Sequence, residues 1–141
     1  MLLENSMTDG KAIVRRVLRA METGDVAEFD AVMAEDYIQH NHLGNGREPV
    51  KKMVAGLRRA FPDLKVVAED VLSEGDRVVA RVTITGTHEG RFLGVDPTHK
   101  AISIRSIDIW RIEDGRLKEH WDVVDRLDFM QQLGLTGGAK G

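Results

Sequence analysis

The apolar residues in about the first 60 positions recur every three or four residues, which is the spacing of amphipathic helices. The pattern predicts three helices, with apolar faces Ile13, Val14, Val17, Leu18 and Met21; then Phe29, Val32 and Met33; then Val50, Met53, Val54, Leu57 and Phe61. Gly24 ends the first helix and Pro62 the third. Asp25 is expected to cap the second helix in a capping box with Glu28.

From Asp63 onward the apolar residues alternate, which is the period of β-strands. The predicted strands cover residues 64–72, 77–87, 101–112 and 116–124, and a short helix over 125–135 closes the chain. Residues 88–100, with Gly90, Gly94 and Pro97, are predicted to form a loop. Helices followed by hairpin strands predict an α+β fold: a curved antiparallel sheet with N-terminal helices packed on it, leaving a concavity for a small ligand.

Length and composition narrow the class of protein. The chain has 141 residues, no cysteine and a net charge of -3 from 20 Lys and Arg and 23 Asp and Glu. We expect a single domain over residues 1–141, with an ordered core over about residues 8–135 and a frayed tail from Gly137. Disulfides and thiolate chemistry are excluded, and nucleic acid is not an expected partner. Without a long apolar run or a secretory signal, a cytoplasmic protein with no membrane partner is predicted.

The last predicted hairpin gathers short ionisable residues. A turn over residues 113–115, with Gly115 in the left-handed conformation, places His120 opposite Asp108 and Asp122 opposite Ser106. A two-residue turn would set Asp122 opposite Ile107 instead. In the first register one face carries Ser106, Asp108, Trp110, His120 and Asp122, and the other carries Ile107, Ile109, Trp121 and Val123.

The polar face of this hairpin has two interpretations. It could be a solvated exterior, which is common for polar strand residues. It could also line a pocket, because both strands are rich in Ile, Val and Trp on either side, as in sheets covered on both faces. The apolar face is better explained by dimerisation than by exposure to water.

Residues 37–42 also alternate. Ile38, His40 and His42 point one way, and Tyr37, Gln39 and Asn41 point the other. The histidines could end a strand in hydrogen bonds to loop carbonyls, or one of them could line the same concavity as Asp122. We favour His40 for the second role.

Several separated motifs share one family pattern. They are HEGRFLGVDPT at 88–98, EHWD at 119–122, QLG at 132–134, FPDL at 61–64 and GDRV at 75–78. Together, from about Thr8 to Leu135, the chain resembles the SnoaL-like polyketide cyclases. The resemblance implies a nuclear transport factor 2-like α+β cone with an interior cavity, often dimeric through its outer sheet face. It also implies intramolecular aldol ring closure with no cofactor and no metal.

The resemblance carries residue roles onto this chain. Asp122 matches the family's acid/base aspartate, Asp108 stands where the family has a helper histidine, and His99 replaces the usual loop glycine. We predict Asp122 as base, with His120, His40 or Ser106 donating hydrogen bonds to the enolate oxygen and a protonated Asp108 as a further donor. Ser106, Trp110, Phe92 and Tyr37 are expected to contact a small hydrophobic or carbonyl-rich substrate.

Other functions are also compatible with these residues. The same fold could be a non-catalytic module that binds a small molecule. An epoxide hydrolase-like site would need Asp108, Asp122 and an arginine. Arg81 is the candidate arginine, because Arg105 falls on the opposite face. An isomerase-like activity is a further alternative. A metal held by His40, His42, His120 and Asp122 has acceptable ligand types but no motif-like spacing. We therefore predict no metal.

Overall fold

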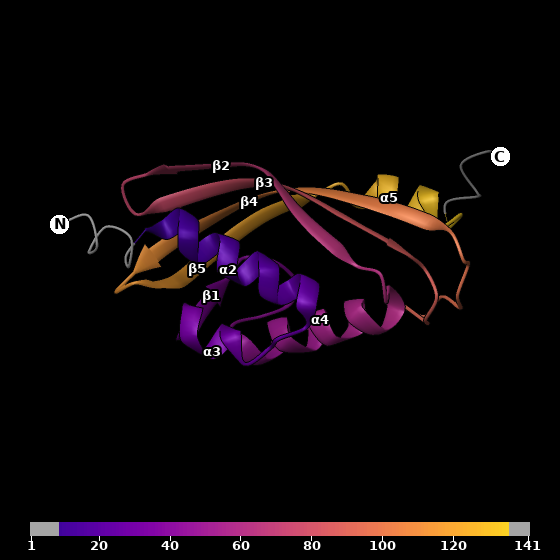
Figure 1. Cartoon of the computed structure of the whole chain (residues 1–141), viewed down its shortest axis with the longest axis horizontal. Coiled ribbons are helices and arrows are strands. Elements are labelled where there is room, and N and C mark those ends of the chain that lie inside the picture. The colour runs from indigo at the N-terminus through magenta and orange to yellow at the C-terminus, as the bar shows by residue number, and fades with distance from the viewer. Residues whose placement is uncertain (1–8, 136–141) are drawn as a thin grey trace.

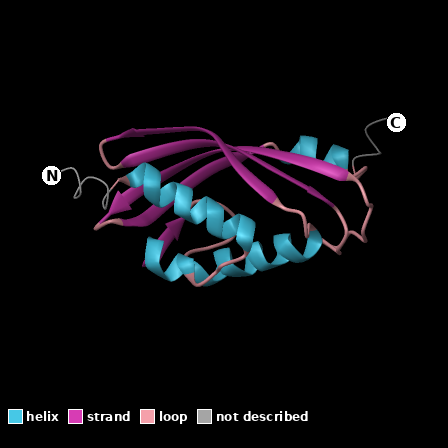
Figure 2. Ribbon diagram, viewed as in Figure 1, coloured by secondary structure: helices cyan, strands magenta, loops and turns pink. Residues whose placement is uncertain are grey.

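The computed structural model describes residues 9–135, so the predicted start of the core at residue 8 and the tail from residue 137 lie outside them. The elements in chain order are α2 (Gly10–Thr23), α3 (Glu28–Val32), β1 (Met33–Gln39), α4 (Arg47–Ala60), β2 (Lys65–Glu74), β3 (Arg77–Thr87), β4 (Ala101–Glu113), β5 (Arg116–Val124) and α5 (Arg126–Gln132). Figure 1 and Figure 2 show a curved sheet with α2, α3 and α4 together along one side of it. The α+β class is confirmed, while the interior cavity and the single domain stay predictions.

The sheet has five strands in the order β1-β5-β4-β3-β2. The pairs β2–β3, β3–β4 and β4–β5 are antiparallel, as predicted. The edge strand β1 runs parallel to β5, so the predicted antiparallel sheet is confirmed except at this edge. The predicted second helix is also too long, because the chain becomes extended at Met33 and pairs there with Leu117. This parallel pair brings the end of β1 beside the middle of β5.

The helix ends follow local chemistry in two cases and not in a third. Asp9 caps α2 by accepting the Lys11 N–H at 2.9 Å, and Gly24 closes it at φ 81°. The capping box predicted at Asp25 is wrong: Ala27 precedes α3 without a side-chain cap, and the Asp25 backbone carbonyl accepts the Glu28 N–H. Because a backbone carbonyl already accepts this N–H, the Asp25 carboxylate is not needed as a cap.

The main hydrophobic core lies between the helices and the inner face of the sheet. Buried residues from α2, α3 and α4 meet alternating residues of β3 and β4, among them Val14, Val17, Phe29, Val54, Val78, Ala80, Val82 and Trp110. The predicted period of two in β3 is confirmed, since Val78, Ala80 and Val82 are each at most 2% exposed. Burial of these side chains holds the helices on this face.

The loop over residues 88–100 is held by contacts within the loop and with neighbouring residues. His88 is fully buried, and its Nδ1 atom accepts the Thr98 N–H at 3.2 Å. A side chain at Gly90 would collide with the backbone carbonyl of Arg59, so this close approach requires glycine. His99 has φ 60°, a left-handed conformation that favours glycine and that histidine adopts here. Phe92 packs between Phe61 and Phe129, with ring centroids at 5.5 and 6.1 Å.

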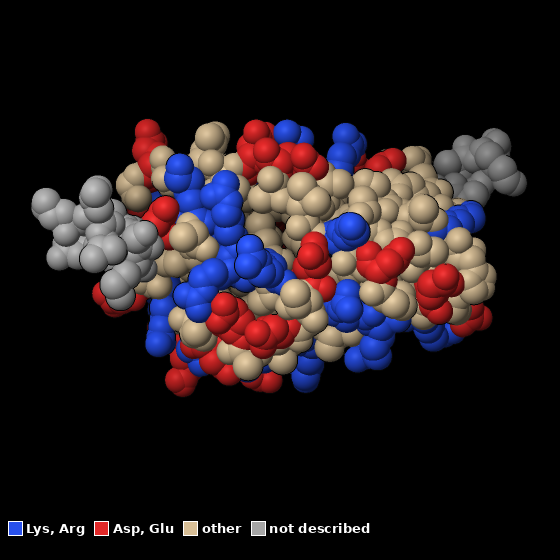
Figure 3. Space-filling view, viewed as in Figure 1, with Lys and Arg blue, Asp and Glu red and all other residues tan. Residues whose placement is uncertain are grey.

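The outer surface is charged over the helices. Figure 3 shows Lys and Arg side chains gathered over α2, where Arg15, Arg16 and Arg19 are exposed. Within residues 9–135, each helix is too short or too polar to span a bilayer. The cytoplasmic location stays a prediction.

Candidate functional site

The β4–β5 hairpin turns over two residues rather than the three predicted. Asp114 and Gly115 have φ values of 53° and 74°, and Glu113 pairs with Arg116. Two successive left-handed residues define a type I′ turn. The prediction gave the left-handed conformation to Gly115 alone, whereas aspartate also tolerates it because its short side chain can hydrogen-bond locally.

A bulge in β5 adds a second shift of one residue. Ile112 pairs with Leu117 but Arg111 pairs with Glu119, which leaves Lys118 without a partner on β4. As a result Trp110 lies opposite His120 and Asp108 lies opposite Asp122, and both predicted polar pairings are wrong. The turn and the bulge together move β5 by two residues. Side chains alternate with the same period, so each residue keeps the sheet face that was predicted for it.

The inner face of this hairpin carries a chain of hydrogen bonds. The Ser106 hydroxyl donates to Asp108 Oδ2 at 2.7 Å, and Asp108 Oδ1 lies 2.8 Å from His120 Nε2. The other ring nitrogen, His120 Nδ1, lies 2.5 Å from the side-chain oxygen of Gln39. The side chains of Asp108 and His120 are 12% and 8% exposed, so these contacts are largely shielded from water, which strengthens them.

Asp122 lies at the more open end of this row. Its Oδ2 accepts a hydrogen bond from the Asn41 amide at 3.3 Å, and the residue is half-buried. One ligand atom from each of Asp108, His120 and Asp122 lies within 4.8 Å of the other two. The site therefore combines a buried imidazole–carboxyl pair with a second carboxylate that is more accessible. Such a pairing suits proton transfer, because one group can accept a proton while the other donates one.

Two aromatic residues fix the imidazole. The rings of Trp110 and Tyr37 stack on His120 with centroids at 4.9 and 6.4 Å. Both residues are buried, at 4% and 3% exposure. Burial, together with the neighbouring carboxylates of Asp108 and Asp122, raises the pKa of the Tyr37 hydroxyl far above its ordinary value. Tyr37 is therefore a neutral phenol at this site. That Trp110 and Tyr37 touch substrate stays a prediction.

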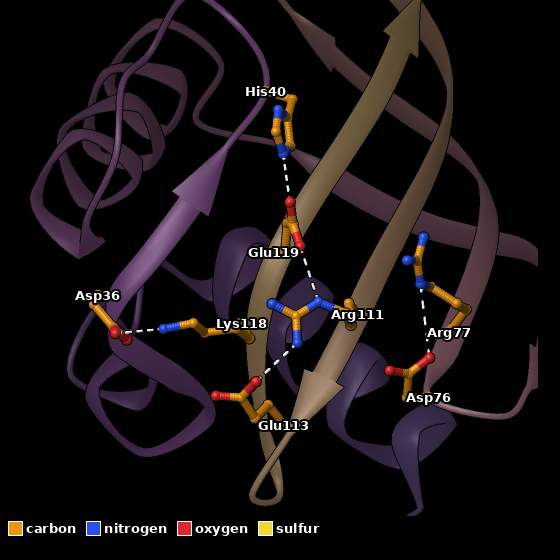
Figure 4. Close-up of polar contacts among 8 residues, drawn as sticks. All are labelled: Asp36, His40, Asp76, Arg77, Arg111, Glu113, Lys118 and Glu119. Carbon is orange, nitrogen blue, oxygen red and sulfur yellow. Dashed lines mark hydrogen bonds and ion pairs between the residues drawn. The ribbon is translucent and has the colours of Figure 1, made fainter.

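His40 is placed away from this site, contrary to expectation. It lies on the outer side of the sheet, where its ring stacks on Trp121 at 4.9 Å and its Nε2 atom lies 2.6 Å from Glu119. Figure 4 shows Glu119 between His40 and Arg111, and Arg111 also bonds to Glu113. The alternation of residues 37–42 explains the error, because it puts His40 on the face opposite Tyr37 and Gln39.

Phe92 makes none of the hydrogen bonds of the polar row and packs among apolar residues. It belongs to the aromatic cluster with Phe61 and Phe129, which packs against Val124 at the far end of β5. A substrate contact by Phe92 stays a prediction.

The epoxide hydrolase-like alternative needs an arginine near the two acids. Arg81 faces the outer side of the sheet and bonds to Asp70 at 2.7 Å, and Arg105 bonds to Asp125 at 2.7 Å. Within residues 9–135, the hydrogen bonds and ion pairs of the structure give neither Asp108 nor Asp122 an arginine partner. Arg81 is thus wrong as the third member of that site.

The structure brings together a different set of possible metal ligands from the set considered in the sequence. Asp108, His120 and Asp122 offer one imidazole and two carboxylates, which are ligand types that divalent cations accept. His40 is on the other side of the sheet, and His42 is exposed and outside this group. The four residues His40, His42, His120 and Asp122 are therefore not brought together as one metal site, and the expectation of no metal stays a prediction.

Two residues of the site were missed from the sequence. Gln39, the last residue of β1, bonds to His120, and Asn41, in the loop that follows β1, bonds to Asp122. The signal was present, because the alternation of residues 37–42 places Gln39 and Asn41 on the same side as Tyr37. His40, by the same alternation, lies on the other face.

The fold and this row of groups define an α+β protein with a partly buried acid–base site. The family model of the SnoaL-like polyketide cyclases matches residues 11–133, and the chain belongs to this family. It is 33% identical over 128 residues to aklanonic acid methyl ester cyclase DnrD of Streptomyces peucetius, covering 86% of this chain and 88% of that one.

Solved structures agree with this assignment. TsrD from Streptomyces laurentii superimposes with a TM-score of 0.82 at 31% identity, covering 88% of this chain and 93% of TsrD. AclR from Streptomyces galilaeus, described as a candidate hydroxylase, gives a TM-score of 0.81 at 30% identity, with 92% and 87% covered. The family and fold expected from the separated motifs are confirmed.

Proposed function

We propose that this protein closes a ring in a small carbonyl-rich polyketide by an intramolecular aldol reaction, with Asp122 as general base. The observation that carries the proposal is the position of the Asp122 carboxylate, half-buried and within 4.8 Å of the Asp108–His120 pair. Family membership and the likeness to a methyl ester cyclase supply the class of substrate.

The proposed reaction moves one proton and forms one carbon–carbon bond. Asp122 takes the acidic proton that lies between two carbonyl groups of the substrate, which leaves an enolate. The enolate carbon attacks a second carbonyl of the same molecule, and that carbonyl oxygen becomes an alkoxide. The Asp108–His120 pair stabilises the developing negative charge by hydrogen bonding and supplies the proton that completes the hydroxyl group. Each step uses side chains of the chain itself.

The test compares Asp122→Asn with the unchanged protein, using aklanonic acid methyl ester as the probe. Removal of the base should lower kcat by at least about 100-fold, the lower end of what positioned proton transfer contributes. Asp114→Asn is the matched control. Asp114 lies at the exposed tip of the same hairpin, and asparagine tolerates its left-handed φ of 53°, so turnover should be unchanged.

Two outcomes would contradict this proposal. Near-normal turnover by Asp122→Asn would remove Asp122 as the base. Binding of the probe in a thermal-shift assay, with no chemical change even after long incubation, would favour the alternative of a non-catalytic binding module.

We also propose that two copies of the chain associate through the outer sheet face. An apolar patch crosses four strands there, formed by Leu72, Val79, Ile107, Ile109, Trp121 and Val123. Leu72, Ile107 and Val123 are 65%, 44% and 75% exposed in the single chain. A contiguous apolar patch on a sheet is unfavourable in water and is typical of a protein interface. A two-fold pairing would cover the same patch on both copies.

A further inference from the structure

The contacts of His120 show acceptor atoms at both ring nitrogens. Nδ1 lies 2.5 Å from Gln39 Oε1, and Nε2 lies 2.8 Å from Asp108 Oδ1. An amide oxygen can only accept a hydrogen bond, so the proton in the first contact belongs to Nδ1. The second contact then joins a ring nitrogen to a carboxyl oxygen, and one more proton must lie between them.

Either position of that second proton gives the Asp108–His120 pair the same net charge. If it is on Nε2, a histidine cation faces a carboxylate; if it is on Asp108, a neutral imidazole accepts from a carboxylic acid. In both cases the pair has zero net charge and contains a transferable proton. The Ser106 hydroxyl donates to the other Asp108 oxygen and fits both states. The negative charge of the three residues Asp108, His120 and Asp122 then lies on Asp122.

We propose that Gln39 is the positioning residue that keeps this proton at the site, by holding a hydrogen on His120 Nδ1. This inference rests on the proposed ring closure. It explains how the Asp108–His120 pair keeps the proton that it donates in that reaction. Without the Gln39 oxygen, a neutral His120 could keep its only hydrogen on Nε2 and donate it to the Asp108 carboxylate. The pair would then be negatively charged, with one proton fewer, beside the Asp122 carboxylate.

The fold holds Gln39 in place on its backbone as well as its side chain. Gln39 is the last residue of β1 and is 9% exposed, and its Cα partner across the parallel pair is His120 itself. Its N–H donates to Asn45 Oδ1 at 2.9 Å, and the next N–H, of His40, donates to the His120 carbonyl at 3.0 Å. The side-chain contact is thus set by the strand register.

The proton count closes over one reaction cycle. Asp122 gains the proton removed from carbon, and the Asp108–His120 pair loses one to the alkoxide. Transfer of the proton from Asp122 to the pair restores both, across groups that lie within 4.8 Å of one another. Substrate and product are isomers, so no external acid, base or oxidant is consumed.

The test is nitrogen-15 NMR of the His120 ring at pH 7 without substrate, combined with kinetics on aklanonic acid methyl ester. The unchanged protein should show a protonated Nδ1. Gln39→Met, which fills similar volume without an acceptor, should shift the ring to an unprotonated Nδ1 and lower kcat about 100-fold, with a smaller effect on KM. Gln39→Glu, which restores an acceptor oxygen, should keep the hydrogen on Nδ1.

The matched control is Gln131→Met, the same substitution at an exposed position of α5, which should change neither the spectrum nor kcat. An unprotonated Nδ1 in the unchanged protein, or a protonated one in Gln39→Met, would overturn the inference. The protonation of Nδ1 in the unchanged protein can be measured without any variant. The test therefore remains possible even if Gln39→Met fails to fold. Because the spectrum needs no substrate, an error about ring closure would appear in the kinetics alone.

Discussion

At the scale of single residues, the site depends on how each polar atom is partnered. The carboxyl group of Asp108 would be costly to bury alone, and its hydrogen bonds with Ser106 and His120 offset that cost. Asp122 has one long hydrogen bond, from Asn41, and is more exposed. The two aspartates, on the paired strands β4 and β5, therefore differ in burial and in hydrogen bonding. Such a difference is expected when one carboxyl group serves as base and the other belongs to the proton donor.

Another single residue, Asp63, predicts a pH dependence of stability. Its carboxylate accepts the Thr87 N–H at 2.7 Å and the Thr87 hydroxyl at 2.8 Å, and these bonds hold its pKa below the ordinary value. Because the folded-state pKa is lowered, the stabilisation is present above the unfolded pKa, about 3.9, and is lost as the pH falls through the folded pKa.

Asp63→Asn should therefore lower Tm near pH 7, and the difference from the unchanged protein should shrink as the pH drops below about 4. Thermal unfolding from pH 7 to pH 3 measures this. Thr87→Val removes the hydroxyl bond but keeps the backbone bond, so it should lower Tm while retaining part of the pH dependence. Parallel curves for Asp63→Asn and the unchanged protein across this range would show that Asp63 makes no such contribution.

At the scale of elements, the β4–β5 hairpin decides which polar groups meet. The two-residue turn and the bulge at Lys118 each shift β5 by one position, so Asp108 comes to lie opposite Asp122. The bulge leaves Lys118 free of β4, and its side chain pairs with Asp36 on β1, as Figure 4 shows. A hairpin with only one of these features would turn either Asp108 or Asp122 to the outer face.

The turn conformation can be tested by Gly115→Ala. Gly115 has φ 74° and open space around it, so an added methyl group meets no neighbour and only the backbone conformation opposes it. The free energy of unfolding should fall by about 1 kcal/mol, measured by urea denaturation.

Gly56→Ala is the matched control for that substitution. Gly56 lies inside α4, where an added methyl group makes only ordinary contact with Arg59, and alanine should raise the free energy of unfolding by about 0.5–1 kcal/mol. If Gly115→Ala were also stabilising, a left-handed backbone at this position would be contradicted.

At the scale of the whole molecule, the topology joins distant segments into one site. β1 enters the sheet parallel to β5, and this places Gln39 and Asn41 beside His120 and Asp122, which follow about 80 residues later in the chain. The inner face of the sheet packs against the helices and holds the acid–base row. The outer face retains an exposed apolar patch that the single chain does not cover.

That patch predicts the size of the particle in solution. Light scattering should give twice the 15.7 kDa mass of the chain, and Val123→Lys should give a monomer, because a charge within the interface cannot be buried without a partner. Leu127→Lys is the matched control: Leu127 is 62% exposed on α5, outside the strands that form the patch, and the dimer should persist. A monomer in the unchanged protein would contradict this association.

The sequence by itself determined the properties that repeat locally. Helical spacing defined the faces of α2 and α4, and a period of two put Asp108, His120 and Asp122 on one sheet face, even though the predicted register was two residues off. Tertiary structure alone decided which strand lies beside which, and so brought Gln39 to His120 and left His40 against Trp121. The physical reason is that side-chain alternation is set by the backbone within each strand, whereas register and neighbours depend on turns, a bulge and packing between residues far apart in the chain.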